Sequence, residues 1–174
     1  MKKILFMLGC IVLGALVGLG CGGGSASNGP VTSTSTTSNS LVFTVSTPHR
    51  TYARGAAIPI PITFTVVNTG TQAANLTVGS CDDFVVLVSQ GTQQVWLGPH
   101  DACVGIIRSV SIAAGATQTY NATWNQTDSQ GNAIGAGTYI LLGKFTPLTL
   151  NGAALNSAQA ATFSSDPISI NIAP

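Results

Sequence analysis

Hydrophobic and polar residues alternate along most of the chain after residue 40. In residues 58–68, apolar side chains occupy every second position: Ile60, Ile62, Phe64 and Val66. Threonine and proline fill the positions between them. Successive side chains of a β-strand point to opposite faces, so this alternation predicts a strand that buries one face.

Segments of the same kind recur through the rest of the chain. They are residues 41–46, 75–79, 84–90, 94–97, 106–115, 116–125 and 137–145, with shorter apolar runs at 161–163 and 168–172. A short loop at Gly91 predicts a hairpin between two of them. No long segment has a helical period, and residues 151–161 fit either one helical turn or a loop. The pattern predicts an all-β fold, an antiparallel immunoglobulin-like sandwich of about 7–9 strands.

Composition strengthens this prediction. Charged residues make up 6% of the 174-residue chain, against about 25% in typical soluble proteins. There is no glutamate, so helical surfaces would lack one of their best formers and its ion pairs. The formal charge of +1 argues against nucleic acid or an anionic membrane surface as a partner, because both require a basic patch.

The N-terminus has the pattern of an export signal. Residues 1–20 begin with Lys2 and Lys3 and continue as an apolar run that is rich in small residues. A transmembrane anchor is the alternative, but the run is at the short limit for a span, and no basic cluster follows it. The end of the run, Gly-Leu-Gly before Cys21, resembles a bacterial lipobox. That resemblance implies cleavage before Cys21 and a lipid on this cysteine.

Residues 21–40 follow as a segment rich in serine and threonine. Such a segment has too little apolar surface to offset the entropy of ordering it, which predicts a flexible tether. The expected organisation is a signal peptide over 1–20, a lipidated tether over 21–40 and one β-sandwich domain over 41–174. The expected location is the cell surface or the periplasmic face of a membrane.

Two longer stretches carry a family resemblance. They read ITFTVVNTGTQAANLTVGSCDDFVVLVSQGTQQVWLG (62–98) and VSIAAGATQTYNATWNQTDSQGNAIGAGTYIL (110–141). In order and spacing their motifs resemble the BsuPI family of intracellular proteinase inhibitors. The matching positions are Asn68, Gly70, Asp83 to Val86, Val95, Trp96, Gly115, Tyr120, Trp124, Gly137, Thr138 and Tyr139.

The resemblance implies a non-catalytic domain that binds a serine proteinase through a loop at one end of the sandwich. The motif residues themselves have structural chemistry. Trp96 and Trp124 suit the core or its edge, since each has a large apolar body and one N–H donor. Tyr139 suits a tyrosine corner, in which its hydroxyl bonds to backbone. Asp83 is expected to accept hydrogen bonds from loop amides.

Cys81 and Cys103 remain after the signal segment is removed. A cysteine pair in an exported domain predicts a disulfide, which would stabilise by roughly 3 kcal/mol for a loop of about 22 residues. A metal site is the alternative, since the bridge would gather Asp82, Asp83, His100 and Asp101. No zinc-type spacing is present, and we expect neither a metal nor another cofactor.

The chain lacks a G-x-S-x-G elbow and a P-loop, and we expect no enzymatic activity. A Ser-His-Asp triad stays open at this level, because triads are assembled in space. The segment 97–105, LGPHDACVG, is the candidate proteinase-binding loop. Its candidate contact residues are Pro99, His100, Asp101, Ala102 and Val104. The alternative function is a surface-displayed structural or adhesive immunoglobulin-like module without inhibitory activity.

Overall fold

A computed structural model describes residues 28–36, 39–55, 57–79, 83–99 and 106–174. Within these ranges no helix is long and apolar enough to cross a membrane. The predicted signal peptide and the lipidation site Cys21 lie outside the described residues.

The described chain is built almost entirely of strands, and the predicted all-β sandwich is confirmed. The elements are β1 (Val31–Thr36), β2 (Leu41–Thr47), β3 (Thr51–Ala53), β4 (Ile60–Asn68), β5 (Ala74–Gly79), β6 (Phe84–Gln90), β7 (Gln93–Gly98), β8 (Ile107–Ile112), β9 (Thr117–Trp124), β10 (Gly137–Phe145), β11 (Pro147–Leu150), β12 (Ala153–Ala154), α1 (Ser157–Ala161) and β13 (Ile168–Ala173). The strands outnumber the 7–9 that the sequence predicted, because additional strands form at the N-terminal edge and after β10.

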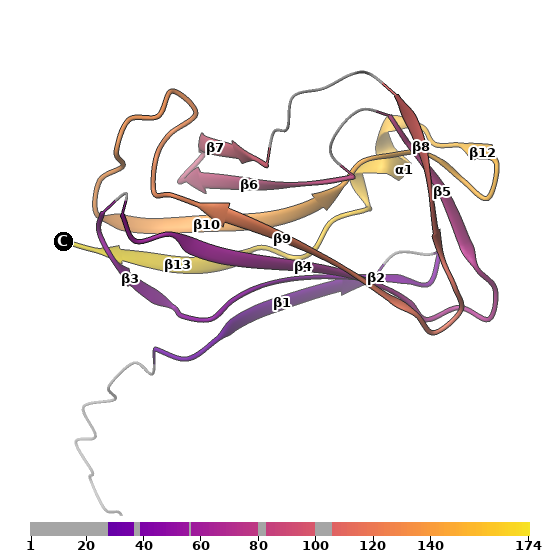
Figure 1. Cartoon of the computed structure of the whole chain (residues 1–174), viewed down its shortest axis with the longest axis horizontal. Coiled ribbons are helices and arrows are strands. Elements are labelled where there is room, and N and C mark those ends of the chain that lie inside the picture. The colour runs from indigo at the N-terminus through magenta and orange to yellow at the C-terminus, as the bar shows by residue number, and fades with distance from the viewer. Residues whose placement is uncertain (1–27, 37–38, 56, 80–82, 100–105) are drawn as a thin grey trace, which may run out of the picture.

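Two sheets form the layers of the sandwich (Figure 1). One has the order β1-β2-β4-β9 and the other the order β3-β13-β10-β6-β7. Aromatic rings join the layers: Phe64 of β4 stacks on Phe84 of β6 at 5.8 Å between ring centroids. A third sheet, β12-β11-β5-β8, lies at one end of the molecule. Nearly all described strand pairs are antiparallel, and β13 with β3 is a parallel pair.

The alternation in the sequence corresponds to burial in the structure. Along β4 the buried residues are Ile60, Ile62, Phe64, Val66 and Asn68, while the residues between them are half-buried or exposed. The partner strand β2 alternates in the same way. Since side chains of a strand alternate between faces, one face of this sheet lies in the core and the other faces solvent.

The predicted tether is wrong for residues 31–36, which form strand β1. This strand pairs with β2 from Val31 opposite Thr47 to Thr36 opposite Val42. Val31 is buried against the core. The hydrophobic period and the composition of residues 31–36 do not reveal this strand. An edge strand gains its hydrogen bonds from a neighbouring strand and needs little apolar surface of its own. Threonine also has a high strand propensity.

The sequence left residues 151–161 open between one helical turn and a loop, and the structure shows a short hairpin followed by a helix. Asn151 and Gly152, both with positive φ, turn the chain between β11 and β12, as Asn-Gly pairs do in tight hairpins. Helix α1 follows, with a capping box between Asn156 and Gln159. The predicted strand at 161–163 is wrong: this run ends the helix and then buries Phe163 in the core.

The predicted roles of the motif aromatics are confirmed. The Tyr139 hydroxyl donates to the Gly135 carbonyl at 2.9 Å, which is the tyrosine corner. Trp124 is 0% exposed, and its indole N–H donates to the Thr127 carbonyl at 2.8 Å. Trp96 lies at the core edge, 6.4 Å from Trp124 between ring centroids.

Candidate functional site

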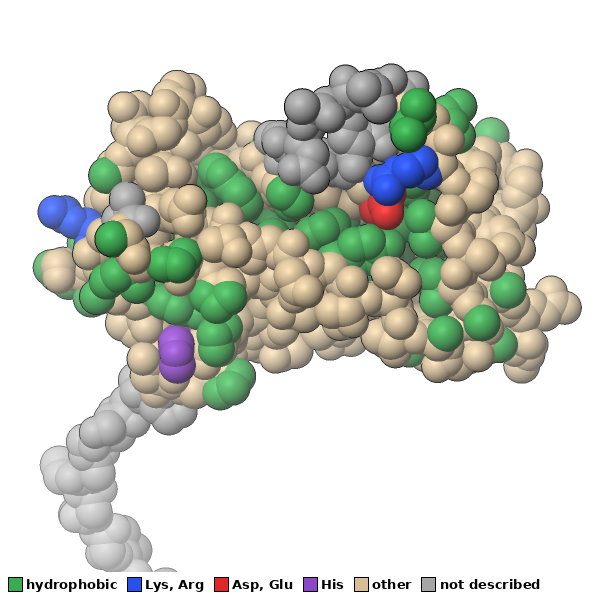
Figure 2. Space-filling model, in the orientation of Figure 1, with side chains coloured by type: hydrophobic (Ala, Val, Ile, Leu, Met, Phe, Trp, Pro, Cys, Tyr) green, Lys and Arg blue, Asp and Glu red, His purple; other side chains and the backbone are tan. Residues whose placement is uncertain are grey.

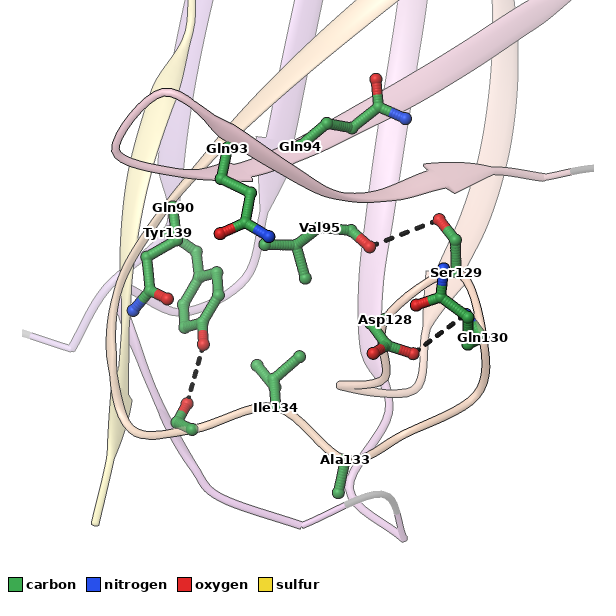
Figure 3. A pocket seen from close by; sticks show the side chains of 11 residues that line it. Gln90, Gln93, Gln94, Val95, Asp128, Ser129, Gln130, Ala133, Ile134 and Tyr139 are labelled. Atoms are coloured by element: carbon green, nitrogen blue, oxygen red, sulfur yellow. Dashed lines mark hydrogen bonds between the residues drawn. The ribbon is translucent and has the colours of Figure 1, made fainter.

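A hollow of about 470 Å³ lies between the β6–β7 hairpin and the loop that joins β9 to β10 (Figure 3). Its lining residues are Gln90, Gln93, Gln94, Val95, Asp128, Ser129, Gln130, Ala133, Ile134, Gly135 and Tyr139. A second hollow of about 460 Å³ adjoins it and is lined by Gln94, Trp96, Leu97, Gly98, Asp128, Ser129 and Gly131. The two share residues on β7 and on the loop, and together we call them the β7 groove.

A bulge in the hairpin shapes the first hollow. The register passes from Val88 opposite Trp96 to Ser89 opposite Gln94, which leaves Val95 as the extra residue of β7. Bulges redirect side chains at sheet edges. In Figure 3 the Val95 side chain points into the hollow. Its carbonyl accepts a hydrogen bond from the Ser129 amide at 3.0 Å, which fastens the loop to the strand edge.

The Asp128 carboxylate organises the loop. It accepts from the Gln130 amide at 2.9 Å, from the Asn132 amide at 2.8 Å and from the Asn132 side chain at 3.0 Å. These hydrogen bonds, foremost that of the Asn132 side chain, hold the pKa of Asp128 below its ordinary value. The carboxylate is therefore occupied within its own loop, and the wall of the groove has a fixed backbone.

This arrangement predicts a pH dependence of stability. The folded-state pKa of Asp128 is lowered, so its contribution is complete above the ordinary aspartate pKa of about 3.9. It is lost as pH falls through the lower folded-state pKa. We expect Asp128→Asn to be less stable than the natural protein at neutral pH, and this difference to vanish at low pH.

Chemical denaturation across pH 2–7 measures this difference. Asp166→Asn, at an exposed position after α1, is the matched control for removing one negative charge. A difference between Asp128→Asn and the natural protein that stayed constant down to pH 2 would contradict the assigned role of this carboxylate.

The floor of the first hollow is apolar and its rim is polar. Figure 3 shows Ile134 and the Tyr139 ring below Val95, with Gln93 pointing into the hollow and Gln94 pointing away from it. Ile134 is 9% exposed, and its amide is bonded to the Gln126 carbonyl. The groove thus combines an apolar base with amide and hydroxyl groups at its edge.

Gln126 supports this loop from behind, a role that no local sequence pattern predicted. Its side chain is 1% exposed. The amide nitrogen donates to the carbonyls of Ala53 at 2.9 Å and Ile58 at 2.8 Å, and the oxygen accepts from the Gly55 amide at 3.0 Å. Both of its N–H donors and its oxygen are bonded, so it links the β9–β10 loop to the β3–β4 connection as a structural residue.

Charge is scarce in and around the groove. Asp128 is the one charged side chain among its described lining residues. Figure 2 shows a face of the molecule on which charged side chains are sparse. In the part of the chain that the structure describes, no three histidine, cysteine or acidic residues are grouped to hold a metal. The groove therefore suits a neutral polar ligand.

The structure describes only the start of the predicted proteinase-binding loop. Leu97 and Gly98 belong to strand β7, so the prediction of a loop from residue 97 is corrected to a start at Pro99. Pro99 is half-buried directly after the strand. The other candidate contacts, His100, Asp101, Ala102 and Val104, lie outside the described residues, as do Cys81, Asp82 and Cys103.

Asp83 makes a contact that the sequence analysis did not predict, while its predicted hydrogen bonds from loop amides stay a prediction, since residues 80–82 lie outside the described residues. Its carboxylate forms an ion pair with Arg108 at 2.5 Å, which links the start of β6 to β8. Nearby Tyr120 has a buried hydroxyl without a hydrogen-bond partner among the described residues. Burial raises the pKa of Tyr120, and the negative charge of Asp83 adds to this effect. Asp83 therefore contributes to a strand contact, which its place beside Cys81 did not reveal.

Comparisons with known proteins assign no family. No family profile matches the chain, and no curated protein matches it. Solved structures that align with the chain include a β-glucosidase from Listeria innocua in complex with glucose, with a TM-score of 0.42, 11% identity, and coverage of 77% of this chain and 16% of that chain. A β-glucosidase from Erythrobacter marinus has a TM-score of 0.40, 11% identity, and coverage of 83% and 16%. The chain spans about one sixth of the length of these structures, and likeness at this level carries no functional argument.

Proposed function

We propose that the chain is an exported, lipid-anchored binding module of the BsuPI type that binds a serine proteinase without catalysing a reaction. The lipid would be attached at Cys21, and the module would face the cell surface or the periplasm. The binding element would be the loop after β7, with Pro99, His100, Asp101, Ala102 and Val104 as its contact residues.

The observation that carries this proposal is the pairing of the strands around the two connections that hold the cysteines. On one side, β5 and β8 pair with Gly79 opposite Ile107. On the other side, β6 and β7 pair with Val86 opposite Gly98. Both connections therefore leave one pair of neighbouring strands and enter another. The described ends of the two connections are thus strand neighbours, which supports the proposal of a disulfide between Cys81 and Cys103.

A disulfide between Cys81 and Cys103 would hold the loop in one conformation before it meets a proteinase. Inhibitory loops depend on such preorganisation, because a loop that is already ordered loses little entropy on binding.

The other residues that carry the resemblance to the BsuPI family belong to the framework of the sandwich. Asn68, for example, uses its side chain to hold turns, donating to the carbonyls of Gln72 at 2.7 Å and Ile112 at 2.9 Å.

This proposal makes Cys103→Ser a specific test. We expect the substitution to weaken proteinase inhibition by about tenfold or more, while the free energy of unfolding falls by roughly 3 kcal/mol and the domain stays folded at 25 °C. Inhibition constants and urea denaturation, each measured with and without reductant, separate the two effects.

The control is reduction of the natural protein, which should reproduce the behaviour of Cys103→Ser. If the fraction of active inhibitor simply followed the fraction of folded protein in both samples, the disulfide would have no role in preorganising the loop. That outcome would contradict the proposed role of the loop in binding, but it would not affect the description of the fold.

A second candidate function is a surface-displayed adhesive module without inhibitory activity. The β7 groove favours it, because an open groove with an amide rim and Asp128 as its one charged side chain among the described lining residues is suited to ligands other than a proteinase. A folded, oxidised protein that inhibits no proteinase but is retained by an envelope component would support this alternative.

A further inference from the structure

We propose that the β7 groove is a binding site for a neutral saccharide, with the sugar ring against the half-exposed Val95 and Trp96 and its hydroxyls at the amide rim. This proposal does not depend on proteinase inhibition, since it rests on residues other than those of the loop after Pro99.

The polar side chains of the groove match hydroxyl chemistry. The rim of the first hollow carries the amides of Gln90, Gln93 and Gln130. A glutamine amide both donates and accepts, and so does every hydroxyl of a sugar. Gln93 points into the hollow. The Ser129 hydroxyl, which donates to the Val95 carbonyl at 3.3 Å, adds an acceptor.

The apolar side chains match the other property of a sugar ring, its C–H face. In the first hollow Val95 is the half-exposed apolar side chain, since Ile134 and Tyr139 behind it are only 9% and 1% exposed. Trp96 lines the second hollow, where its indole covers Gly98. Aromatic faces combine large contact area with little loss of conformational freedom. Two adjoining hollows along one strand fit a linear oligosaccharide.

The lack of cationic side chains in the groove argues against an anionic sugar as its ligand. No lysine or arginine is among the described residues that line either hollow. Phosphorylated or sulfated sugars and nucleotides are bound through such cations. The Asp128 carboxylate, which would repel an anion, is already bonded to Gln130 and Asn132. A neutral ligand is therefore favoured.

Strand addition by a peptide is the main competing use of an edge strand such as β7. It would require free main-chain groups along the strand edge. At the centre of the groove the Val95 carbonyl is already bonded to the Ser129 amide at 3.0 Å. The loop therefore blocks a continuous ladder there. A ligand recognised by side chains, as a saccharide is, meets no such obstacle.

The test is isothermal titration of the full-length protein, in a detergent without a sugar head group, with neutral gluco-, manno- and chito-oligosaccharides. We expect at least one series to bind with a 1:1 stoichiometry and to change the fluorescence of Trp96. Gln93→Ala should weaken that binding by about tenfold, as expected for one lost hydrogen bond that leaves its partner unpaired.

Gln72→Ala is the matched control, since Gln72 is an exposed glutamine outside the groove; its variant should bind like the natural protein. Two results would overturn the proposal: no heat or fluorescence change with any of the three series, or equal weakening by the two glutamine substitutions. Binding of an unfolded polypeptide but of no saccharide would assign the groove to peptides and also overturn it. Proteinase inhibition is not measured in this assay, so the two proposals fail separately.

Discussion

Trp124→Ala is expected to lower the free energy of unfolding by about 3–5 kcal/mol, the range for removing a large aromatic side chain from a core. Trp124 is 0% exposed. Its ring packs edge-on against Tyr139 at 5.4 Å between centroids. Its N–H donates to the Thr127 carbonyl at the start of the β9–β10 loop. The substitution would therefore open a cavity between the layers and release one end of the loop.

Trp96→Ala is the comparison for this prediction. Trp96 is the same residue type at the half-buried edge of the core, 6.4 Å from Trp124 between ring centroids. We expect its removal to cost about 1–3 kcal/mol, because less apolar area returns to water. Urea denaturation of both variants measures the two losses. Equal losses would show that Trp124 is not the buried link between the layers that its contacts indicate.

Gly143→Ala is expected to destabilise the domain by about 1–3 kcal/mol or more, as overpacking of a core does. Gly143 lies in the centre of β10 and faces Phe64 of the opposite layer. A Cβ atom at this position would be 2.3 Å from Phe64 Cδ2 and 2.7 Å from Cε2. Phe64 cannot easily withdraw, because it also stacks on Phe43 and Phe84.

Gly135→Ala provides the matched control, since a Cβ there would meet no atom within 4 Å. We expect it to change stability by less than about 0.5 kcal/mol, as exposed substitutions do. Thermal or urea denaturation of the pair gives the difference. A neutral Gly143→Ala would mean that the two layers are farther apart at this point than the structure indicates.

Strands that contribute to the core were predictable because their period is set by burial. Residues 58–68 alternate in the sequence, and β4 buries the same side chains. The hairpin at Gly91 was predictable for a similar reason, since glycine adopts its φ of 57° at little cost. Trp124 and Tyr139 were assigned to the framework by their chemistry alone, and their hydrogen bonds agree with that assignment.

Other features depend on partners that no local pattern contains. The strand over residues 31–36 has an edge of β2 to pair with, so its own composition was a poor guide. Phe163 is buried without being in a strand, because the chain after α1 returns to the core. Both errors arise from treating each segment as if it folded alone.

The β7 groove could not be read from the sequence for the same reason. Its residues come from the bulged β6–β7 hairpin and from the β9–β10 loop. Strands β8 and β9 separate these two segments in the sequence. Neither the bulge at Val95 nor the Ser129–Val95 hydrogen bond has a sequence signal. Gln90, Gln93 and Gln94 flank the hairpin turn at Gly91, and only the packing of the loop gives them a common site.

The central proposal is that this sandwich binds a serine proteinase, and inhibition by the purified, oxidised domain is its most direct test. The domain should include residues 28–174, since β1 belongs to the fold. It would be measured against a panel of subtilisin-like and trypsin-like proteinases. We predict stoichiometric inhibition of at least one enzyme, with the domain left uncleaved. A folded, oxidised domain that inhibits no member of the panel would contradict the proposal.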